Sequence, residues 1–169
     1  TNLARDAAVL EERLGVSLSE GGKHNLFGTH NKLLNLGDVY LELIAIDPSA
    51  PKPERARWFS LDEFSGDMRL TNWVMGTEKP RRVIGKTLMG TGELMTVSRG
   101  DLTWQITVPK SGKLPLDGFA PAIIDWMGAK TPAERLPDVG CRLEKFEVCH
   151  PHEISLRSFL SPLHSDPRV

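Results

Sequence analysis

Residues 21–47 read GGKHNLFGTHNKLLNLGDVYLELIAID, and the fold of the chain is most visible in this stretch. A glycine pair opens it and Gly37-Asp38 divides it, as is typical where a chain turns between strands. The residues around these turns predict three strands in succession. They cover residues 16–20, 29–35 and 39–47.

Glu42 is the most informative residue of this stretch. It lies inside the apolar run VYLELIAI at 39–46, where an ionised carboxylate needs a cation, a metal or several hydrogen-bond donors. Strand alternation places it on the same face as Tyr40 and Ile44. Glu42 therefore either holds a ligand or closes a buried polar network, and the sequence leaves both readings open.

Composition excludes several classes of partner. The chain has 169 residues, 40% of them hydrophobic and 25% charged, and a formal net charge of −1. Charges of both signs are interspersed, so neither nucleic acid nor an anionic membrane surface is an expected partner. No apolar run approaches the roughly 20 residues that span a bilayer. These values are typical of a globular protein with a sizeable core.

The remaining elements are predicted from periodicity and turn residues. Leucine and alanine at helical spacing predict a helix over residues 3–14 before Gly15. A proline-rich crossing follows at 48–53. Further strands are expected at 58–59, 70–75, 94–98, 102–108, 122–127 and 142–149, and helices at 79–88 and from Pro151-His152 through Leu163.

Two cysteines, Cys141 and Cys149, lie at the ends of the last of these strand-like runs. An extended chain would separate them by roughly 26 Å, which is far beyond the reach of a disulfide. Two unpaired thiols favour a reducing, cytoplasmic setting.

A family resemblance rests on GGKHNLFGTHNKLLNLGDVYLELIAIDP, followed in order by RLTNW at 69–73, SRGDLTW at 98–104 and AIIDW at 122–126. These pieces resemble the glyoxalase-like domain group of the vicinal oxygen chelate superfamily, which includes glyoxalases, bleomycin-resistance proteins and dioxygenases. The resemblance covers about residues 3–165. It implies an α+β fold in which repeated βαβββ modules form curved mixed sheets around a cleft.

The resemblance also implies a division of the chain. Residues 1–50 would form a first module whose first strand lies before Thr1, and residues 51–135 a second module. Residues 136–169 would begin a further strand-helix unit, and the whole would form one compact domain. Exposed sheet edges favour a homodimer.

Superfamily members often hold a divalent metal with His, Gln or Glu, and Glu42 falls where the fourth-strand glutamate would be. With His24 and His30 nearby, the expected ligand set is His24, His30 and Glu42, and the metal Zn, Mn, Ni or Fe. The alternative is that the histidines are hydrogen-bonded at strand ends. The carboxylate would then pair with Arg, Asn or backbone. The stretch at 127–132, where relatives often place a histidine, has none.

Catalytic and substrate-binding roles are assigned on the same basis. Glu42 and Asn31 are the expected catalytic residues, because Asn31 could orient Glu42 or a substrate carbonyl. The expected substrate-binding residues are Trp73, Arg99, Trp104 and Trp126. Core packing of the tryptophans and a solvated turn position for Arg99 are the alternatives.

The function implied is that of an enzyme acting on a small oxygen-bearing molecule, as a metal-dependent lyase, isomerase or dioxygenase. The alternative is a non-catalytic protein that binds or sequesters a small molecule, as drug-resistance relatives do. A cleft that is only structural is the third reading. The sequence contains neither a G-x-S-x-G nucleophile elbow nor a phosphate-binding loop.

Overall fold

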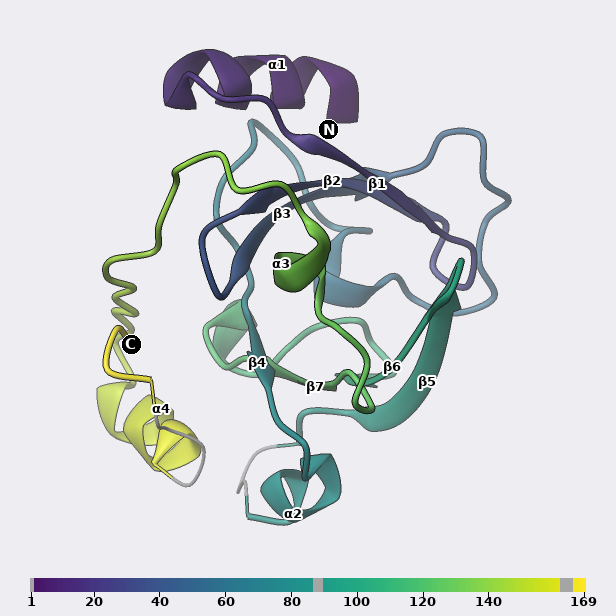
Figure 1. The fold of residues 1–169 in the computed structure, drawn as a ribbon. Helices are drawn as coiled ribbons and strands as arrows, with labels where there is room; N and C mark the ends of the chain where they lie inside the picture. Colours follow the sequence, from purple (N-terminus) through teal and green to yellow (C-terminus); the bar gives the residue numbers. More distant parts are fainter. Residues whose placement is uncertain (1, 87–89, 162–165) are drawn as a thin grey trace.

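Two sheets and a few short helices form the computed structural model, which describes residues 2–86, 90–161 and 166–169 (Figure 1). The first sheet has the order β1-β2-β3, with β1 Ser19–His24, β2 Thr29–Asn35 and β3 Tyr40–Ile46. The second has the order β4-β7-β6-β5, with β4 Val74–Gly76, β5 Glu93–Arg99, β6 Leu102–Val108 and β7 Ala122–Asp125. The first is antiparallel, and the second is mixed because β4 and β7 run parallel. The predicted α+β class is confirmed.

The helices are α1 Leu3–Leu14, α2 Pro80–Ile84, α3 Pro132–Arg135 and α4 Glu153–Leu160. The side chain of Asn2 accepts a hydrogen bond from the Arg5 amide and caps α1, and Gly15 ends it at a φ of 68°. Figure 1 shows α1 against the first sheet, on the side away from the second. None of the described helices has the length and apolarity needed to cross a membrane.

The glycine pair lies inside β1 and not in the turn that the sequence pattern predicted. Pairing of β1 with β2 shifts between Glu20 and Lys23, so Gly21 and Gly22 occupy an irregularity of the strand. A Cβ on Gly21 would lie 2.0 Å from the side-chain oxygen of Asn31. The pair therefore makes room for a side chain of β2, and β1 begins later than expected.

The core lies between the sheets and is closed by the segment after β3. Val97, Trp104 and Ile106 belong to its buried cluster, and Phe27 stacks on Trp58 with ring centroids 4.0 Å apart. The predicted strand at 58–59 is wrong, because Trp58–Ser60 forms a 3₁₀ turn with Phe59 at a φ of 58°.

The predicted strand at 142–149 is also wrong. This segment has no regular secondary structure and pairs with no strand of the described chain. Two of its amides bond to single carbonyls, Leu143 to Leu36 and Phe146 to Arg168. Both cysteines are free, as predicted. The end of the predicted helix at 79–88 and Leu163 lie outside the described residues.

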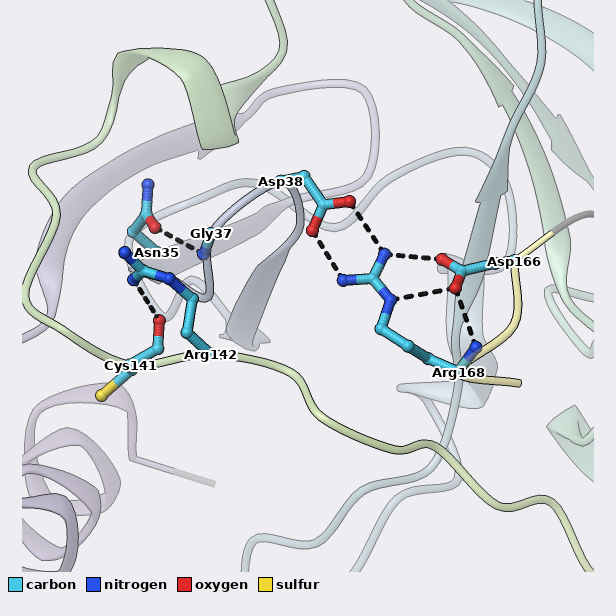
Figure 2. Close-up of polar contacts among 7 residues, drawn as sticks. All are labelled: Asn35, Gly37, Asp38, Cys141, Arg142, Asp166 and Arg168. Atoms are coloured by element: carbon cyan, nitrogen blue, oxygen red, sulfur yellow. Dashed lines mark hydrogen bonds and ion pairs between the residues drawn. The ribbon is translucent and has the colours of Figure 1, made fainter.

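The end of the chain is attached to the β2–β3 turn by charge (Figure 2). The guanidinium of Arg168 bonds both oxygens of Asp38, at 2.6 and 2.9 Å, and also the carboxylate of Asp166. The turn itself is fixed by Asn35, whose side-chain oxygen accepts from the Gly37 amide at 2.7 Å. The C-terminal segment is thus tied to the hairpin that carries Tyr40 and Glu42.

Gly112 supports the 3₁₀ turn at Trp58–Ser60 through its backbone. Its carbonyl accepts from the Ser60 amide at 2.9 Å, and a Cβ on Gly112 would lie 1.9 Å from the Arg57 carbonyl oxygen. Gly128 has a similar positive φ, 79° against 74°, but nothing within 4 Å of its Cβ position.

Gly128→Ala should therefore cost only the left-handed strain, about 1–2 kcal/mol. Gly112→Ala should cost clearly more free energy of unfolding, because backbone must move as well. Urea unfolding of the two variants measures the difference. Equal costs would show that the 58–60 turn does not pack on Gly112.

Candidate functional site

A cavity lies between the two sheets, with the 58–59 turn and α3 contributing to its wall. It contains about 420 Å³ of space outside the protein atoms, part of which is open to solvent. Its aromatic lining residues are Tyr40, Trp58, Phe59, Trp104 and Trp126. Its polar lining residues are His24, Asn31, Glu42 and Arg99. A mostly apolar cavity with a few convergent polar groups is typical of a small-molecule site.

Asn31 is the centre of the polar group. Its side-chain nitrogen donates to Glu42 Oε1 at 2.5 Å. Its side-chain oxygen accepts from the Gly22 amide at 2.8 Å and from Arg99 Nη1 at 3.1 Å. A carboxylate only accepts and a guanidinium only donates, so these partners fix the orientation of the amide. Asn31 is 4% exposed and therefore has little freedom to turn.

The cavity raises the pKa of Glu42 above its ordinary value. Burial is the main cause, and it outweighs the Asn31 hydrogen bond and the positive charge of Arg99, which both lower the pKa. Asn31 is the hydrogen-bond partner of this carboxyl among the described residues. Glu42 is thus a carboxyl group that can take up a proton more readily than an exposed glutamate, beside empty space.

His24 is held neutral on the same wall. Burial, followed by the charge of Arg99, lowers its pKa to about 3. Arg99 Nη1 lies 3.2 Å from Nε2, which must accept because a guanidinium only donates. Nδ1 then carries the proton and donates to the Thr29 hydroxyl at 3.2 Å. The ring also lies edge-on to Trp58, with centroids 4.9 Å apart.

The expected metal ligands do not come together. His24 and Glu42 line the cavity, but His30 alternates with Asn31 along β2 and is not among the lining residues. Within residues 2–86, 90–161 and 166–169, no three His, Cys, Asp or Glu side chains are grouped as metal ligands. The Nε2 lone pair of His24 also faces the Arg99 cation. The donor set present therefore does not fit a divalent metal.

The structure separates the expected substrate-binding residues into two groups. Arg99, Trp104 and Trp126 line the cavity, and the two tryptophan rings lie 5.4 Å apart. Trp73 lies elsewhere: its ring nitrogen donates to the Phe119 carbonyl at 2.8 Å, and the ring packs on Phe146. It attaches the C-terminal segment to the second half of the chain.

Three aromatic lining residues, Tyr40, Trp58 and Phe59, were not predicted as site residues. Tyr40 was visible in principle, because it shares a strand face with Glu42; its burial and the Glu42 charge raise its pKa. Trp58 and Phe59 come from a turn that no periodicity reveals. The buried ring nitrogen of Trp58 has no hydrogen-bond partner in the described structure, and Phe59 has a positive φ. Such departures from ordinary structure are frequent at binding sites.

Comparison with known proteins gives a family and similar solved structures. The model of the glyoxalase-like domain family matches residues 1–163. A crystal structure of a hypothetical protein from Staphylococcus aureus is 16% identical, with a TM-score of 0.45. The match covers 66% of this chain and 50% of that one, so the chain spans half the length of that protein.

No curated protein sequence matches the chain. The family match, in contrast, extends over nearly the whole sequence, from residue 1 to residue 163. The chain belongs to the glyoxalase-like domain family of the vicinal oxygen chelate superfamily.

Proposed function

We propose that this protein is an enzyme that binds a small oxygen-bearing organic molecule between its two sheets, and that Glu42 moves a proton on that molecule. The observation that carries the proposal is the protonatable Glu42 carboxyl, held in an aromatic cavity by Asn31. Groups with shifted pKa values that face a cavity are frequent at catalytic sites.

The chemistry follows from the environment of the carboxyl. A raised pKa brings a glutamate closer to neutral pH, where a general acid or base works best. Asn31 holds Oε1, so the other oxygen is left for a bound molecule. Glu42 in its ionised form would accept a proton from the carbon beside a carbonyl. It would then return that proton to the carbonyl oxygen or to a neighbouring carbon, which is an isomerisation, or give it to a β-hydroxyl oxygen as the C–O bond breaks and water leaves, which is an elimination. The reaction class is therefore isomerisation or elimination.

The other polar residues have supporting roles in this scheme. Asn31 positions the carboxyl, and neutral His24 fixes the Arg99 guanidinium. Trp104 and Trp126 cover apolar parts of the molecule and exclude water, which strengthens the electrostatic interactions inside the cavity. No step is assigned to a metal, because the described donor set does not fit one.

A second candidate function is non-catalytic binding. The aromatic lining favours it, because five aromatic residues and apolar strand residues can hold a flat molecule without any proton transfer. The two functions differ in one requirement. Catalysis needs an ionisable group at position 42, whereas sequestration needs only the shape and the aromatic wall.

We also infer the modular arrangement of the superfamily. The elements β4, α2, β5, β6 and β7 have the order of a βαβββ module, and α1 with β1, β2 and β3 has the order of its last four elements. Module limits near residues 50 and 135 fit the two sheets. A homodimer and a cytoplasmic setting stay predictions.

Glu42→Gln is the direct test of catalysis. Gln keeps the hydrogen bond from Asn31 but cannot take up a proton, so the variant should bind ligand yet lose activity. The assay is deuterium exchange from solvent into a panel of small ketones, aldehydes and hydroxy acids, followed by NMR. Loss of a general base should slow exchange about 10²–10⁴-fold.

His30→Gln is the matched control, since His30 lies in the same sheet but does not line the cavity. It should exchange at the wild-type rate. Equal exchange by wild type and Glu42→Gln would contradict the role of Glu42. Tight binding of panel members with no exchange by the wild type would support the sequestering protein instead.

The state of His24 is a further prediction. With a pKa of about 3, its ring should show the ¹⁵N shifts of neutral imidazole, protonated on Nδ1, from pH 8 down to about pH 4. The folded state then binds fewer protons than the unfolded chain between about pH 3 and 6.5, so this residue's contribution to stability falls as the pH falls through that window. A ring that titrates between pH 6 and 7 would contradict the burial of His24 beside Arg99.

A further inference from the structure

Arg99 places a cation in the cavity, and its surroundings indicate what it binds. We infer that the ligand of this protein is a small organic carboxylate, with its carboxylate on the Arg99 guanidinium and an apolar, flat body against Trp104 and Trp126. The inference rests on the proposed function, for which it names the substrate class.

The local structure is built to bring Arg99 into the cavity. The residue ends β5, and its side chain crosses β1 at Gly22. A Cβ on Gly22 would lie 2.6 Å from Arg99 Cδ, and the backbone of Gly22 is not in the left-handed region. Glycine is therefore required here for passage of the arginine stem and not for a turn.

The guanidinium is held by neutral groups. Its two hydrogen bonds to the described residues both use Nη1, to His24 Nε2 at 3.2 Å and to Asn31 Oδ1 at 3.1 Å. No ion pair with a described carboxylate involves Arg99. Asp101, the nearest acid on its hairpin, bonds Arg135 at 2.7 Å. The charge of Arg99 is thus uncompensated by direct contact, and Nε and Nη2 remain to bind a carboxylate.

Glu42 does not cancel this charge by contact, because the Asn31 amide lies between the two groups, donating to one and accepting from the other. The two groups are nevertheless coupled. The positive charge of Arg99 lowers the pKa of Glu42. An anion bound to Arg99 would offset this effect and raise the pKa of Glu42 further. The ionised carboxylate would then be a stronger base towards the bound ligand.

The tryptophans that line the cavity beside Arg99 offer an apolar wall for the body of the ligand. The Arg99 guanidinium carbon lies 6.0 Å from the Trp104 ring centroid, and Trp126 packs on Trp104. A carboxylate on Arg99 would extend its carbon skeleton along these rings. Burial of the apolar ligand body against the tryptophan rings supplies affinity. The guanidinium favours ligands that carry a negative charge.

The experiment compares acids with amides of nearly the same shape. Acetate and acetamide, and benzoate and benzamide, are titrated at 0.15 M salt into the protein, and the indole N–H signals of the tryptophans are followed by NMR. Wild type should bind at least one acid about tenfold or more tightly than its amide, since charge-assisted bonds are much stronger than neutral ones.

Three variants identify the residue responsible. Arg99→Gln should abolish the preference for acid over amide. Gly22→Ala should do the same with the charge retained, because its Cβ occupies the path of the arginine stem. Arg135→Gln, on a surface arginine beside the same hairpin, should keep the full preference. Near-UV circular dichroism checks that each variant has the wild-type fold.

The outcome is decisive in both directions. An acid preference that depends on Arg99 and Gly22 supports the inference. Equal binding of acids and amides by the wild type, binding of neither, or an unchanged preference in folded Arg99→Gln overturns it. The Glu42→Gln variant distinguishes this inference from the proposed catalytic role. If the variant keeps both the preference for acids and the full rate of proton exchange, the anion site is supported and the proposed role of Glu42 is contradicted.

Discussion

The hydrogen bonds of the Asn31 amide are the constraint on which the site depends. One end of this side chain donates to Glu42, and the other accepts from Arg99 and from the Gly22 amide. An anionic and a cationic group are thereby kept in one cavity without forming a direct ion pair. A direct pair would neutralise both groups, whereas this arrangement leaves a carboxyl with a raised pKa and a cation with free donors.

Backbone features of the first sheet make that arrangement sterically feasible. A Cβ at Gly21 would collide with Asn31, and one at Gly22 would collide with Arg99. The irregular pairing of β1 with β2 at these residues gives both side chains their path. The strained 58–60 turn presents Trp58 and Phe59 to the same space. The site is thus built from an irregularity in strand β1 and from a turn with positive φ angles, and not from regular strands alone.

The sequence shows those parts of the structure that depend on periodicity. Strands β2, β3, β5 and β6 and helix α1 follow from alternation and helical spacing, and Glu42 is visible as a lone acid in an apolar strand. Its contact with Asn31 also follows, because the two residues occupy neighbouring strands. Segment 142–149 alternates equally well but has no partner strand in the described chain, so alternation alone misleads there.

Contacts between segments that lie far apart in the sequence cannot be predicted from periodicity. Nothing in residues 98–101 shows that Arg99 crosses β1 to reach His24, 75 positions away in sequence. The expected ligand set of His24, His30 and Glu42 is not brought together in the described structure, and the wall to which it was assigned already contains the Arg99 guanidinium. The 58–60 turn depends on a carbonyl at Gly112, which only the tertiary structure brings into place.

The most direct test is the titration of Glu42 itself. Protein with ¹³C-labelled glutamate carboxyls is titrated by NMR, and the signal that disappears in Glu42→Gln identifies the residue. We expect this carboxyl to titrate above the ordinary glutamate pKa of 4.5, and higher still in Arg99→Gln, which removes a positive charge that lowers it. A Glu42 pKa at or below 4.5, or one that does not respond to loss of Arg99, would contradict the account.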